Sequence, residues 1–574
     1  MEAPLGKQKV NQGLAPFIVE LLTIFISDFQ EALMRNRAGK SISLLVLLMS
    51  LGSSAFGATI SGTVKDSDGS PIKGAFVQAR SGPMPNSSVV VLSDWQGQYR
   101  MENLSPGEYQ VFAWKIGYRA TSPTPARVAD SQATSLNFDL PKAKVRWTEV
   151  SLREGQLLLP EGPGKGVYFD KCTGCHGFQR FMAGARTDLN GWHRVVQYMR
   201  NEMRVSLTVS FKDEDEKLVA SWFNQVFGVD SDAPASPEDL PNFQQAWRGE
   251  YSDESMNIVY GLYDLPSMAP RAFPFSARPD EQDIVWLPSY AQGSVGRLDP
   301  KTGKVDYHRF TMPPDPVAGT RAAVHGSAPS PDGRSVWLAV TDNNRVGKLD
   351  RRTGEIGLFT PPPAPAQARR MGLQRGSVHD VWSDSKGIVW TAGGPVQRFD
   401  PKTEQWTQIR ELPGTYGMVI DQNDDVWETE FRPGGALAKV DGKTFKVTKY
   451  YPPNKRAHPR RVVVDSKGNV WVGDWSGALL RFDPKTESFR EYKIPGPEPT
   501  PYSIQVDKND RVWFTSHHND YLGRLDPQTG RFTQYPLPVV SDIGTREMYR
   551  DSQGRMWVAS PPNDKVISFI PPGM

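Results

Sequence analysis

The sequence predicts a mainly β chain with three folded parts: an N-terminal β-sandwich, a small α-helical domain and a C-terminal seven-bladed β-propeller. Residues 59–142 contain short alternating strands, residues 161–230 have helical periodicity, and residues 255–574 contain an internal repeat. A chain of 574 residues is also too long for a single hydrophobic core. Its 51 glycines and 48 prolines favour many turns and short strands over long helices.

Charge and cysteine content exclude several classes of protein. The chain has 67 basic and 64 acidic residues and a formal net charge of +3, a balance that argues against nucleic acid as a partner. The two cysteines lie three positions apart, which excludes a network of structural disulfides. After the N-terminal region, no segment of the sequence is apolar enough to span a membrane.

The N-terminal region contains a secretory signal. Residues 34–58 have a basic stretch, an apolar run and then small residues around the expected cleavage site. The mature protein is therefore expected to be periplasmic or secreted. Because a signal peptide opens its protein, translation is expected to begin at Met34, with residues 1–33 reflecting a misplaced start codon. The alternative, a membrane segment at 17–29, is shorter than the roughly 20 apolar residues that a span needs and contains two acidic residues.

Residues 59–142 alternate polar and apolar side chains in short runs, separated by glycine-containing turns. They carry the motifs G-x-V-x-D-x-x-G-x-P-I-x-G-A-x-V, S-D-x-x-G-x-Y and L-x-P-G-x-Y-x-V. With these motifs the segment resembles the carboxypeptidase regulatory-like domain family over its whole length. The resemblance implies an adhesive or spacer module without catalysis. Residues 143–160 are expected to form a linker.

The segment 161–230 is predicted to be helical. A first helix over 189–203 places Trp192 and further apolar side chains on one face, and a second helix over 213–227 has acidic residues in its first turn. The Pro- and Asp-rich residues 231–254 are expected to form a second linker.

A tryptophan that closes a short strand after a turn repeats seven times in residues 255–574. Successive tryptophans are 51, 53, 37, 44, 42 and 44 residues apart, close to the roughly 45 residues of a four-stranded blade. The last repeat lacks an outer strand, so residues 258–266 are expected to pair into it and close the ring, which removes two open sheet edges. The seven tryptophans are Trp286, Trp337, Trp390, Trp427, Trp471, Trp513 and Trp557.

The helical segment carries a haem attachment motif, Cys172-Thr-Gly-Cys175-His176. Two thiols one helical turn apart can reach the two vinyl groups of one porphyrin, and the next residue places its imidazole under the iron. The adjoining histidine and the signal peptide favour haem over a thiol redox pair or half of a zinc site. The segment resembles a class I cytochrome c domain over about 70 residues. The resemblance implies one covalently bound haem c and single-haem electron transfer.

The second axial ligand of the iron is less defined by the sequence. Met199 is preferred and Met203 is the alternative, while Met182, His193 and an open coordination site remain further options. A methionine on a helix face can also simply pack in the core. An open site would turn the haem from an electron carrier into a catalyst.

The repeats resemble the virginiamycin B (streptogramin) lyase family of seven-bladed propellers. The resemblance rests on a pattern seen in Trp513-Phe-Thr-Ser, Gly523-Arg-Leu-Asp-Pro and Tyr535-Pro-Leu-Pro. It implies the fold more strongly than the activity, because these residues are architectural. The family's activity implies histidines on late innermost strands. This chain has Arg460 and Arg546 at those positions, with His458 as a partial substitute, so its catalytic residues stay unassigned.

Alignment of the innermost strands on the Asp that ends each one predicts a group of side chains around the central channel. Two arginines, two tyrosines and a histidine there would suit an anionic or phenolic molecule. The predicted channel residues are His379, Tyr416, Arg460, Tyr502 and Arg546, with His458, Glu430, Asp474 and His517 from neighbouring loops.

These features favour an exported c-type haem protein. Its haem segment is expected to transfer electrons, coupled to a propeller that binds a small molecule or a redox partner protein. One alternative is a carbon–oxygen lyase like the streptogramin lyases, with an accessory haem domain. Another is a haem-based sensor or interaction protein without catalysis.

Overall fold

The computed structural model describes residues 58–573 with short gaps. Residues 1–57, which contain the predicted start-codon region and nearly all of the predicted signal peptide, lie outside the described part. The gaps after residue 58 are residues 83, 131, 174–176, 180–181, 185, 202–210, 232, 248, 267–272, 291–292, 314–321, 342, 364–377 and 540–544.

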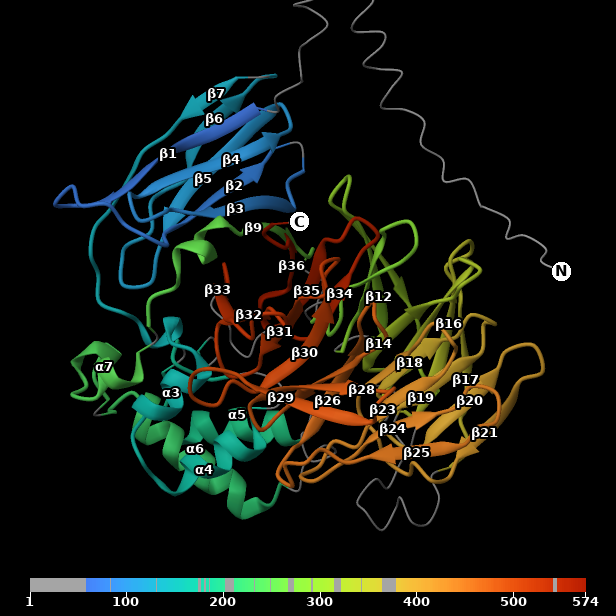
Figure 1. The fold of residues 1–574 in the computed structure, drawn as a ribbon. Helices are drawn as coiled ribbons and strands as arrows, with labels where there is room; N and C mark the ends of the chain where they lie inside the picture. The colour runs from blue at the N-terminus through green and yellow to red at the C-terminus, as the bar shows by residue number, and fades with distance from the viewer. Residues whose placement is uncertain are drawn as a thin grey trace, which may run out of the picture. The chain divides into compact units, whose positions relative to one another are not determined.

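The chain is mainly β, with 42% strand and 13% helix. Many of the strands and helices are labelled in Figure 1. Among the described residues, the longest helices are too short or too polar to cross a bilayer.

The N-terminal part is the predicted β-sandwich. One sheet has the order β4-β1-β7, with β8 also paired to β1, and the other contains β3-β2-β5-β6. Alternation along β4 and β5 buries one face of each strand, and the buried side chains form one apolar core. The strands are β1 (Ala58–Asp66), β2 (Phe76–Ser81), β3 (Ser87–Leu92), β4 (Gln98–Leu104), β5 (Gly107–Trp114), β6 (Thr124–Val128), β7 (Ala133–Ser135) and β8 (Phe138–Leu140).

The middle part of the chain is helical. The second predicted helix matches α6, and the first begins as predicted at Leu189 in α5. The helices are η1 (Trp147–Glu149), α3 (Leu152–Leu158), α4 (Pro163–Lys171), α5 (Leu189–Asn201), α6 (Asp213–Phe227), η3 (Pro237–Asp239), α7 (Phe243–Ala246) and η4 (Asp253–Asn257).

The segments expected as linkers instead pack into the helical core. In 143–160, Trp147 is buried in that core, and its indole N–H donates to the carbonyl of Pro234 at 2.8 Å. In 231–254, Phe243 is buried in the same core. Proline- and acid-rich sequence marks changes of chain direction, which do not prevent its apolar side chains from being buried.

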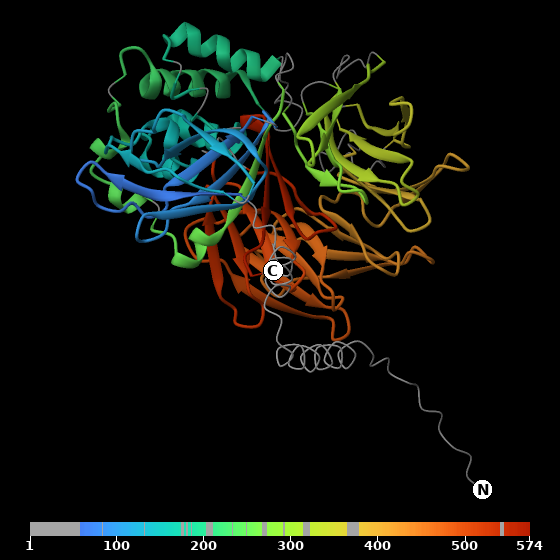
Figure 2. The same cartoon turned by 90° about the horizontal axis from the view of Figure 1, so that it is seen from above.

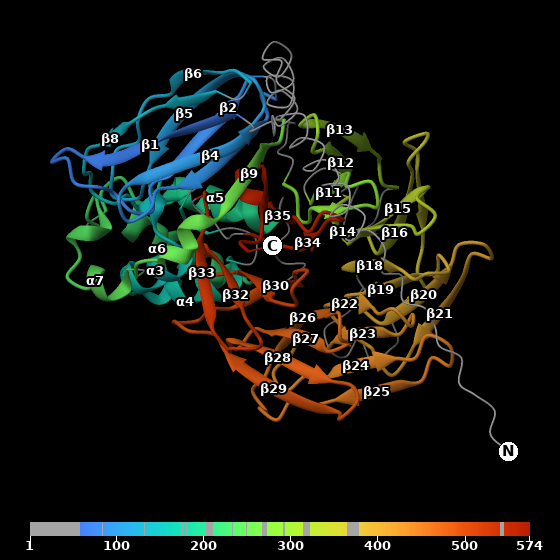
Figure 3. The same ribbon diagram turned by 45° about the horizontal axis from the view of Figure 1, so that its top comes forward.

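The C-terminal part consists of seven blades of four antiparallel strands each, as predicted. Six blades are separate sheets, and the seventh is part of a larger sheet. The blades are shown in Figure 3. The first three blades are β10 (Arg278–Pro279), β11 (Val285–Pro288), β12 (Ser294–Asp299) and β13 (Lys304–Arg309); β14 (Val324–Pro329), β15 (Ser335–Val340), β16 (Arg345–Asp350) and β17 (Ile356–Phe359); and β18 (Asp380–Ser383), β19 (Val389–Ala392), β20 (Val396–Asp400) and β21 (Gln405–Ile409). The next three are β22 (Met418–Ile420), β23 (Val426–Thr429), β24 (Leu437–Val440) and β25 (Val447–Tyr450); β26 (Pro459–Val464), β27 (Val470–Asp474), β28 (Ala478–Asp483) and β29 (Ser488–Lys493); and β30 (Pro501–Val506), β31 (Val512–Ser516), β32 (Tyr521–Leu525) and β33 (Phe532–Pro536).

The seventh blade closes the ring in the way that the sequence predicts. Its strands β34 (Met548–Arg550), β35 (Met556–Ser560) and β36 (Lys565–Ile570) are completed by β9 (Val259–Asp264), which pairs antiparallel with β36. The opposite edge of β9 pairs with β3 of the sandwich. Blade and sandwich therefore share one eight-stranded sheet, β34-β35-β36-β9-β3-β2-β5-β6.

An aspartate–tryptophan hydrogen bond recurs at the turn after the innermost strand. Asp465, for example, accepts the backbone N–H groups of Lys467 and Asn469 and the indole N–H of Trp471 at 2.9–3.0 Å. In blade 2, Ser330 stands at the position of the aspartate. The bond fixes the register of the innermost strand against the tryptophan strand. The ribbons of the blades are coloured from green to red in Figure 2. The pairs are Asp280–Trp286, Asp384–Trp390, Asp421–Trp427, Asp465–Trp471, Asp507–Trp513 and Asp551–Trp557.

Candidate functional site in the propeller channel

One residue of each blade, five positions before the turn Asp or Ser330, belongs to a closed circle of side chains. We call these seven residues the channel ring. Each member contacts the next one, and every member is aromatic, an imidazole or a guanidinium. In blade order the members are Phe275, His325, His379, Tyr416, Arg460, Tyr502 and Arg546.

The contacts within the channel ring are close and continuous. The ring centroids of His325 and His379 lie 3.7 Å apart, and those of His379 and Tyr416 lie 4.2 Å apart. The Phe275 and His325 centroids are separated by 4.6 Å. The guanidinium of Arg546 completes the circle, at 5.0 Å from the rings of both Tyr502 and Phe275. Flat side chains therefore line the whole circumference of the channel.

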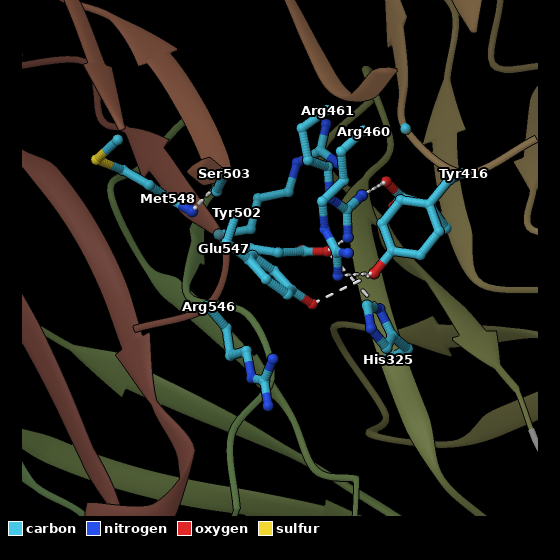
Figure 4. Close-up of polar contacts among 12 residues, drawn as sticks. His325, Tyr416, Arg460, Arg461, Tyr502, Ser503, Arg546, Glu547 and Met548 are labelled. Atoms are coloured by element: carbon cyan, nitrogen blue, oxygen red, sulfur yellow. Dashed lines mark hydrogen bonds and ion pairs between the residues drawn. The ribbon is translucent and has the colours of Figure 1, made fainter. Parts of the chain in front are cut away.

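Arg460 is enclosed by aromatic faces. Its guanidinium carbon lies 4.2 Å from the rings of Tyr502 and Trp475, 4.5 Å from Tyr416 and 4.6 Å from Phe431. One Nη donates to the Tyr416 hydroxyl at 2.6 Å (Figure 4). The buried Nε has no acceptor among the described residues. The aromatic faces stabilise the cation and fix its plane while they leave hydrogen-bonding capacity for a ligand.

The histidines around the channel are neutral at physiological pH. Burial lowers the pKa of His325, His379 and His517 well below the ordinary value, and nearby arginines lower it further. The Nδ1 atom of each of the three is buried without a hydrogen-bond partner among the described residues. Neutral imidazoles of this kind can donate to a ligand or accept from it.

The two tyrosines of the channel ring differ in acidity. Burial raises the pKa of Tyr502, but Arg546, Arg460 and Arg461 outweigh it and the net shift is downward. Burial also raises the pKa of Tyr416, and there the net shift is upward. The two hydroxyl oxygens lie 3.5 Å apart. The arginines therefore make Tyr502 the more acidic of the two hydroxyl groups.

The next residue of each innermost strand belongs to a second layer, in which three charged side chains meet. Arg461 donates to Asp380 at 2.7 Å and also to Glu547, and the Tyr549 hydroxyl donates to Glu547 at 2.9 Å. We call Asp380, Arg461 and Glu547 the ion layer. They come from blades 3, 5 and 7, so their contacts join blades that are not neighbours in the ring. Arg461 and Glu547 are labelled in Figure 4.

Small residues at the same level leave room for the ion layer. A Cβ atom on Gly326 would lie 2.8 Å from an Asp380 oxygen, and one on Gly417 would lie 2.3 Å from the Arg460 carbonyl oxygen.

Glu547 is a fully buried carboxyl group of the ion layer. Burial raises its pKa to about 7, and the charge of Arg461 opposes that rise. The side chain is 1% exposed. A carboxyl group with this pKa changes protonation near neutral pH, which is the range required of a proton acceptor or donor.

The predicted loop residues have different roles. His517 stacks on Tyr502 with centroids 5.6 Å apart, and His458 stacks on Phe431 at 4.1 Å, so both lie next to the channel ring. The carboxylate of Glu430 instead binds Arg432 and Lys449. Asp474 accepts the backbone N–H of His458 at 2.6 Å and fixes that loop. The two carboxylates are therefore held by loop and strand contacts rather than by the channel ring.

The alignment of the innermost strands in the sequence did not identify Phe275, His325 or any residue of the ion layer. Phe275 lies five residues before Asp280, and His325 lies five residues before Ser330, so the same register identifies both. The ion layer follows at the next position of each strand. Its pairing was not visible in the sequence, because Arg461 lies 81 residues from Asp380 and 86 from Glu547.

The haem motif is described only in part. Cys172 is the C-terminal capping residue of α4 and packs against the helical core. Cys175, His176 and Met203 lie outside the described residues. Among the other candidate ligands, Met182 is buried, whereas His193 and Met199 are partly exposed on α5.

The surroundings of Cys172 are apolar, because it packs against the core of the helical part. Helices α4 and α6 approach closely at Gly164, where a Cβ atom would lie 2.2 Å from the Leu218 carbonyl oxygen. The start of α4 therefore packs closely against α6, whose Trp222 and Phe223 belong to the core that Cys172 also contacts. A thiol at this position can form a thioether bond while apolar side chains cover the attached macrocycle. Among the described residues, no cluster of three His, Cys, Asp or Glu has a metal-binding arrangement.

Two family models match parts of the chain. The carboxypeptidase regulatory-like domain model matches residues 59–141, and the virginiamycin B lyase family model matches residues 401–571. The N-terminal sandwich and the virginiamycin B lyase-like propeller fold are thus supported by sequence and structure together. A search of curated proteins gives no match.

Solved structures with similar folds are distant in sequence. A virginiamycin B lyase from Staphylococcus aureus has 17% identity, covering 54% of this chain and 98% of that chain, with a TM-score of 0.46. A streptogramin B lyase has 18% identity over 54% and 97% of the two chains, with a TM-score of 0.46. A hydrazine synthase from Kuenenia stuttgartiensis has 11% identity over 53% and 97%, with a TM-score of 0.43. At these identities the similarity concerns the fold alone.

Proposed function

We propose that this chain is an exported c-type haem protein whose propeller channel binds a small anionic aromatic molecule. Its haem segment exchanges electrons with that molecule or with a redox partner protein. The observation that carries the ligand proposal is the aromatic enclosure of Arg460, a buried cation whose Nε has no acceptor among the described residues.

The side chains of the channel ring are suited to binding a planar anion. Its seven members include two guanidiniums and no carboxylate, and the carboxylates of the ion layer are bonded to Arg461. An anionic group can pair with Arg460, and a planar ring can stack on Tyr416, Tyr502 or Trp475. The neutral histidines can accept from a hydroxyl group of the same ligand. A phenolic acid satisfies all three kinds of contact.

The haem part of the proposal rests on the motif and on the position of Cys172. Cys172 and Cys175 would hold the porphyrin through thioether bonds, and His176 would ligate the iron with Met199 as the preferred second ligand. When bound, the haem supplies one-electron chemistry. Helix α3 of the helical part also contacts the propeller, because the backbone N–H of Arg153 donates to the carbonyl of His518 at 3.0 Å. His518 follows His517, so the helical part touches the loop that borders the channel ring.

Export is supported by the signal-like residues 34–58 and by the carboxypeptidase regulatory-like match at 59–141. Periplasmic or extracellular location also agrees with haem c, whose attachment takes place outside the bacterial cytoplasm.

Absorption spectra test the haem assignment. Full-length protein made in a host with haem-attachment machinery is expected to show the sharp bands of a reduced c-type haem. A Cys172→Ala, Cys175→Ala variant is expected to lack them, because both thioether bonds are removed. Colourless wild-type protein, or pigment that acidified acetone extracts, contradicts the assignment.

Calorimetric titration with 4-hydroxybenzoate tests the ligand site. Arg460→Gln is expected to weaken binding roughly tenfold to a hundredfold, because a charge-assisted hydrogen bond is worth about 1.5–3 kcal/mol. Arg490→Gln is the matched control: Arg490 is exposed and lies over the ring of Tyr492 at 4.7 Å, outside the channel ring, so its loss is expected to leave affinity unchanged. Equal affinity of wild type and Arg460→Gln contradicts the proposal.

Carbon–oxygen lyase activity is a second candidate, favoured by Glu547. A carboxyl group with a pKa of about 7 in the channel can accept a proton from a substrate near neutral pH. Arg460 and Arg546 are nonetheless arginines where the lyase resemblance implies histidines. Ring opening of a cyclic ester by the haem-free double cysteine variant, abolished by Glu547→Gln, would support the lyase over electron transfer.

A further inference from the structure

The charge of the channel ring and the protonation of the ion layer are physically linked. Arg460 and Arg461 are adjacent in sequence and belong to adjacent layers. The pKa of Tyr502, a member of the channel ring, responds to burial first and then to Arg546, Arg460, Arg461 and Glu547. A charge placed in the channel ring therefore acts on Glu547 across a short, buried path, where the screening by water and salt is weak.

Glu547 has a defined set of charged and titratable neighbours from every strand packed against it. Its two oxygens bond Arg461 and the Tyr549 hydroxyl, and His325 Nδ1 lies 3.7 Å from Oε1. Together, the groups facing it are Arg461 on β26, Asp380 on β18, Tyr549 on β34, Arg278 on β10, His325 on β14, and Tyr502 in the channel ring.

We propose that the channel takes up its anionic ligand together with a proton, and that the carboxyl group of Glu547 receives this proton. The inference rests on the proposed anion site. An anion that pairs with Arg460 brings negative charge into a space that already holds two carboxylates. Protonation of one of them removes the new repulsion, so anion affinity and proton affinity increase together.

The hydrogen bonds select Glu547 over Asp380. One oxygen of Asp380 accepts the backbone N–H of Val381 at 2.9 Å and the other accepts from Arg461, so both are held by donors that cannot become acceptors. Glu547 instead accepts from the hydroxyl of Tyr549. A hydroxyl group can rotate and accept a hydrogen bond from a protonated carboxyl, which keeps both partners satisfied after the proton arrives.

The acidity of the group agrees with this role. The pKa of Glu547, raised by burial to about 7, leaves the carboxyl close to half protonated at neutral pH. A small additional negative potential then causes a measurable uptake of protons. The neutral histidines are poorer acceptors, because burial lowers their pKa well below the ordinary value.

Titration calorimetry of full-length protein with 4-hydroxybenzoate at pH 7, in two buffers with different ionisation enthalpies, counts the protons taken up. Wild type is expected to take up roughly half a proton per ligand, and its affinity is expected to fall by up to about tenfold per pH unit above pH 7. Glu547→Gln is expected to bind the ligand with no proton uptake and with an affinity that changes little between pH 6.5 and 8.

Glu428→Gln is the matched control. Glu428 is a second fully buried glutamate of the propeller, and burial raises its pKa well above the ordinary value, which favours its neutral form. This variant is expected to take up the same number of protons as wild type. Binding without proton uptake in wild type, or unchanged uptake in Glu547→Gln, overturns the proton linkage but leaves the anion site intact. Absence of any binding overturns both.

Discussion

At the scale of residues, one repeated aspartate determines where the side chains of each blade point. The turn Asp binds backbone N–H groups and a tryptophan of its own blade, so the residue five positions earlier always reaches the channel ring. This local rule is why His379, Tyr416 and Arg460 could be assigned to the channel from sequence. The ion layer could not be assigned, because its contacts depend on three blades meeting across the axis.

The turn aspartate also contributes to stability. Asp465→Ala is expected to lower the apparent thermal midpoint of the propeller, because it leaves the buried indole N–H of Trp471 and two backbone N–H groups without acceptors. Each unsatisfied buried donor costs about 1–3 kcal/mol. Thermal unfolding followed by tryptophan fluorescence measures the change.

Asp483→Ala provides the comparison, since Asp483 accepts the backbone N–H of Lys485 in an exposed hairpin turn. It is expected to shift the midpoint much less, because water can replace the lost acceptor. Equal shifts for the two variants would show that the indole bond adds nothing to stability.

At the scale of elements, the closing strand was predictable and the packed linkers were not. The seventh repeat lacks an outer strand, and residues 258–266 alternate like a strand, which together predicted that the two pair. In the structure β9 pairs with β36, as expected. By contrast, 143–160 and 231–254 lack a long periodic pattern. Their burial depends on single side chains such as Trp147 and Phe243, whose contacts with the helical core form only in the folded chain.

The closing strand gives a prediction about local opening. Leu262 is buried in β9 and lies opposite Ile567 of β36 and Ser88 of β3. Leu262→Pro is expected to speed hydrogen exchange of the β36 amides more than tenfold, because proline removes a backbone donor and disturbs the pairing.

Val259→Pro is the control for this variant. Val259 is the first residue of β9 and is exposed, and proline is tolerated at such a position. Exchange in β36 is expected to stay near the wild-type rate in Val259→Pro, and exchange in β23 is expected to stay unchanged in both variants. Unchanged β36 exchange in Leu262→Pro would contradict closure through β9.

At the scale of the whole molecule, three parts with separate sequence signatures are joined by backbone hydrogen bonds. The sandwich and the propeller were recognisable from motifs and repeats, and both are present. The sequence did not indicate how closely they are connected, because strand pairing between β3 and β9 involves main-chain atoms that no motif records.

Strand β9 pairs with β3 of the sandwich and with β36 of the last blade, so the sandwich is attached where the propeller ring closes. A spacer module on a loose tether would transmit no load to its neighbour. Here, any pull on the sandwich is carried through β3 to β9, and from β9 to the last blade. A surface or partner that anchors the sandwich would therefore load the propeller at the joint where its first and last segments meet.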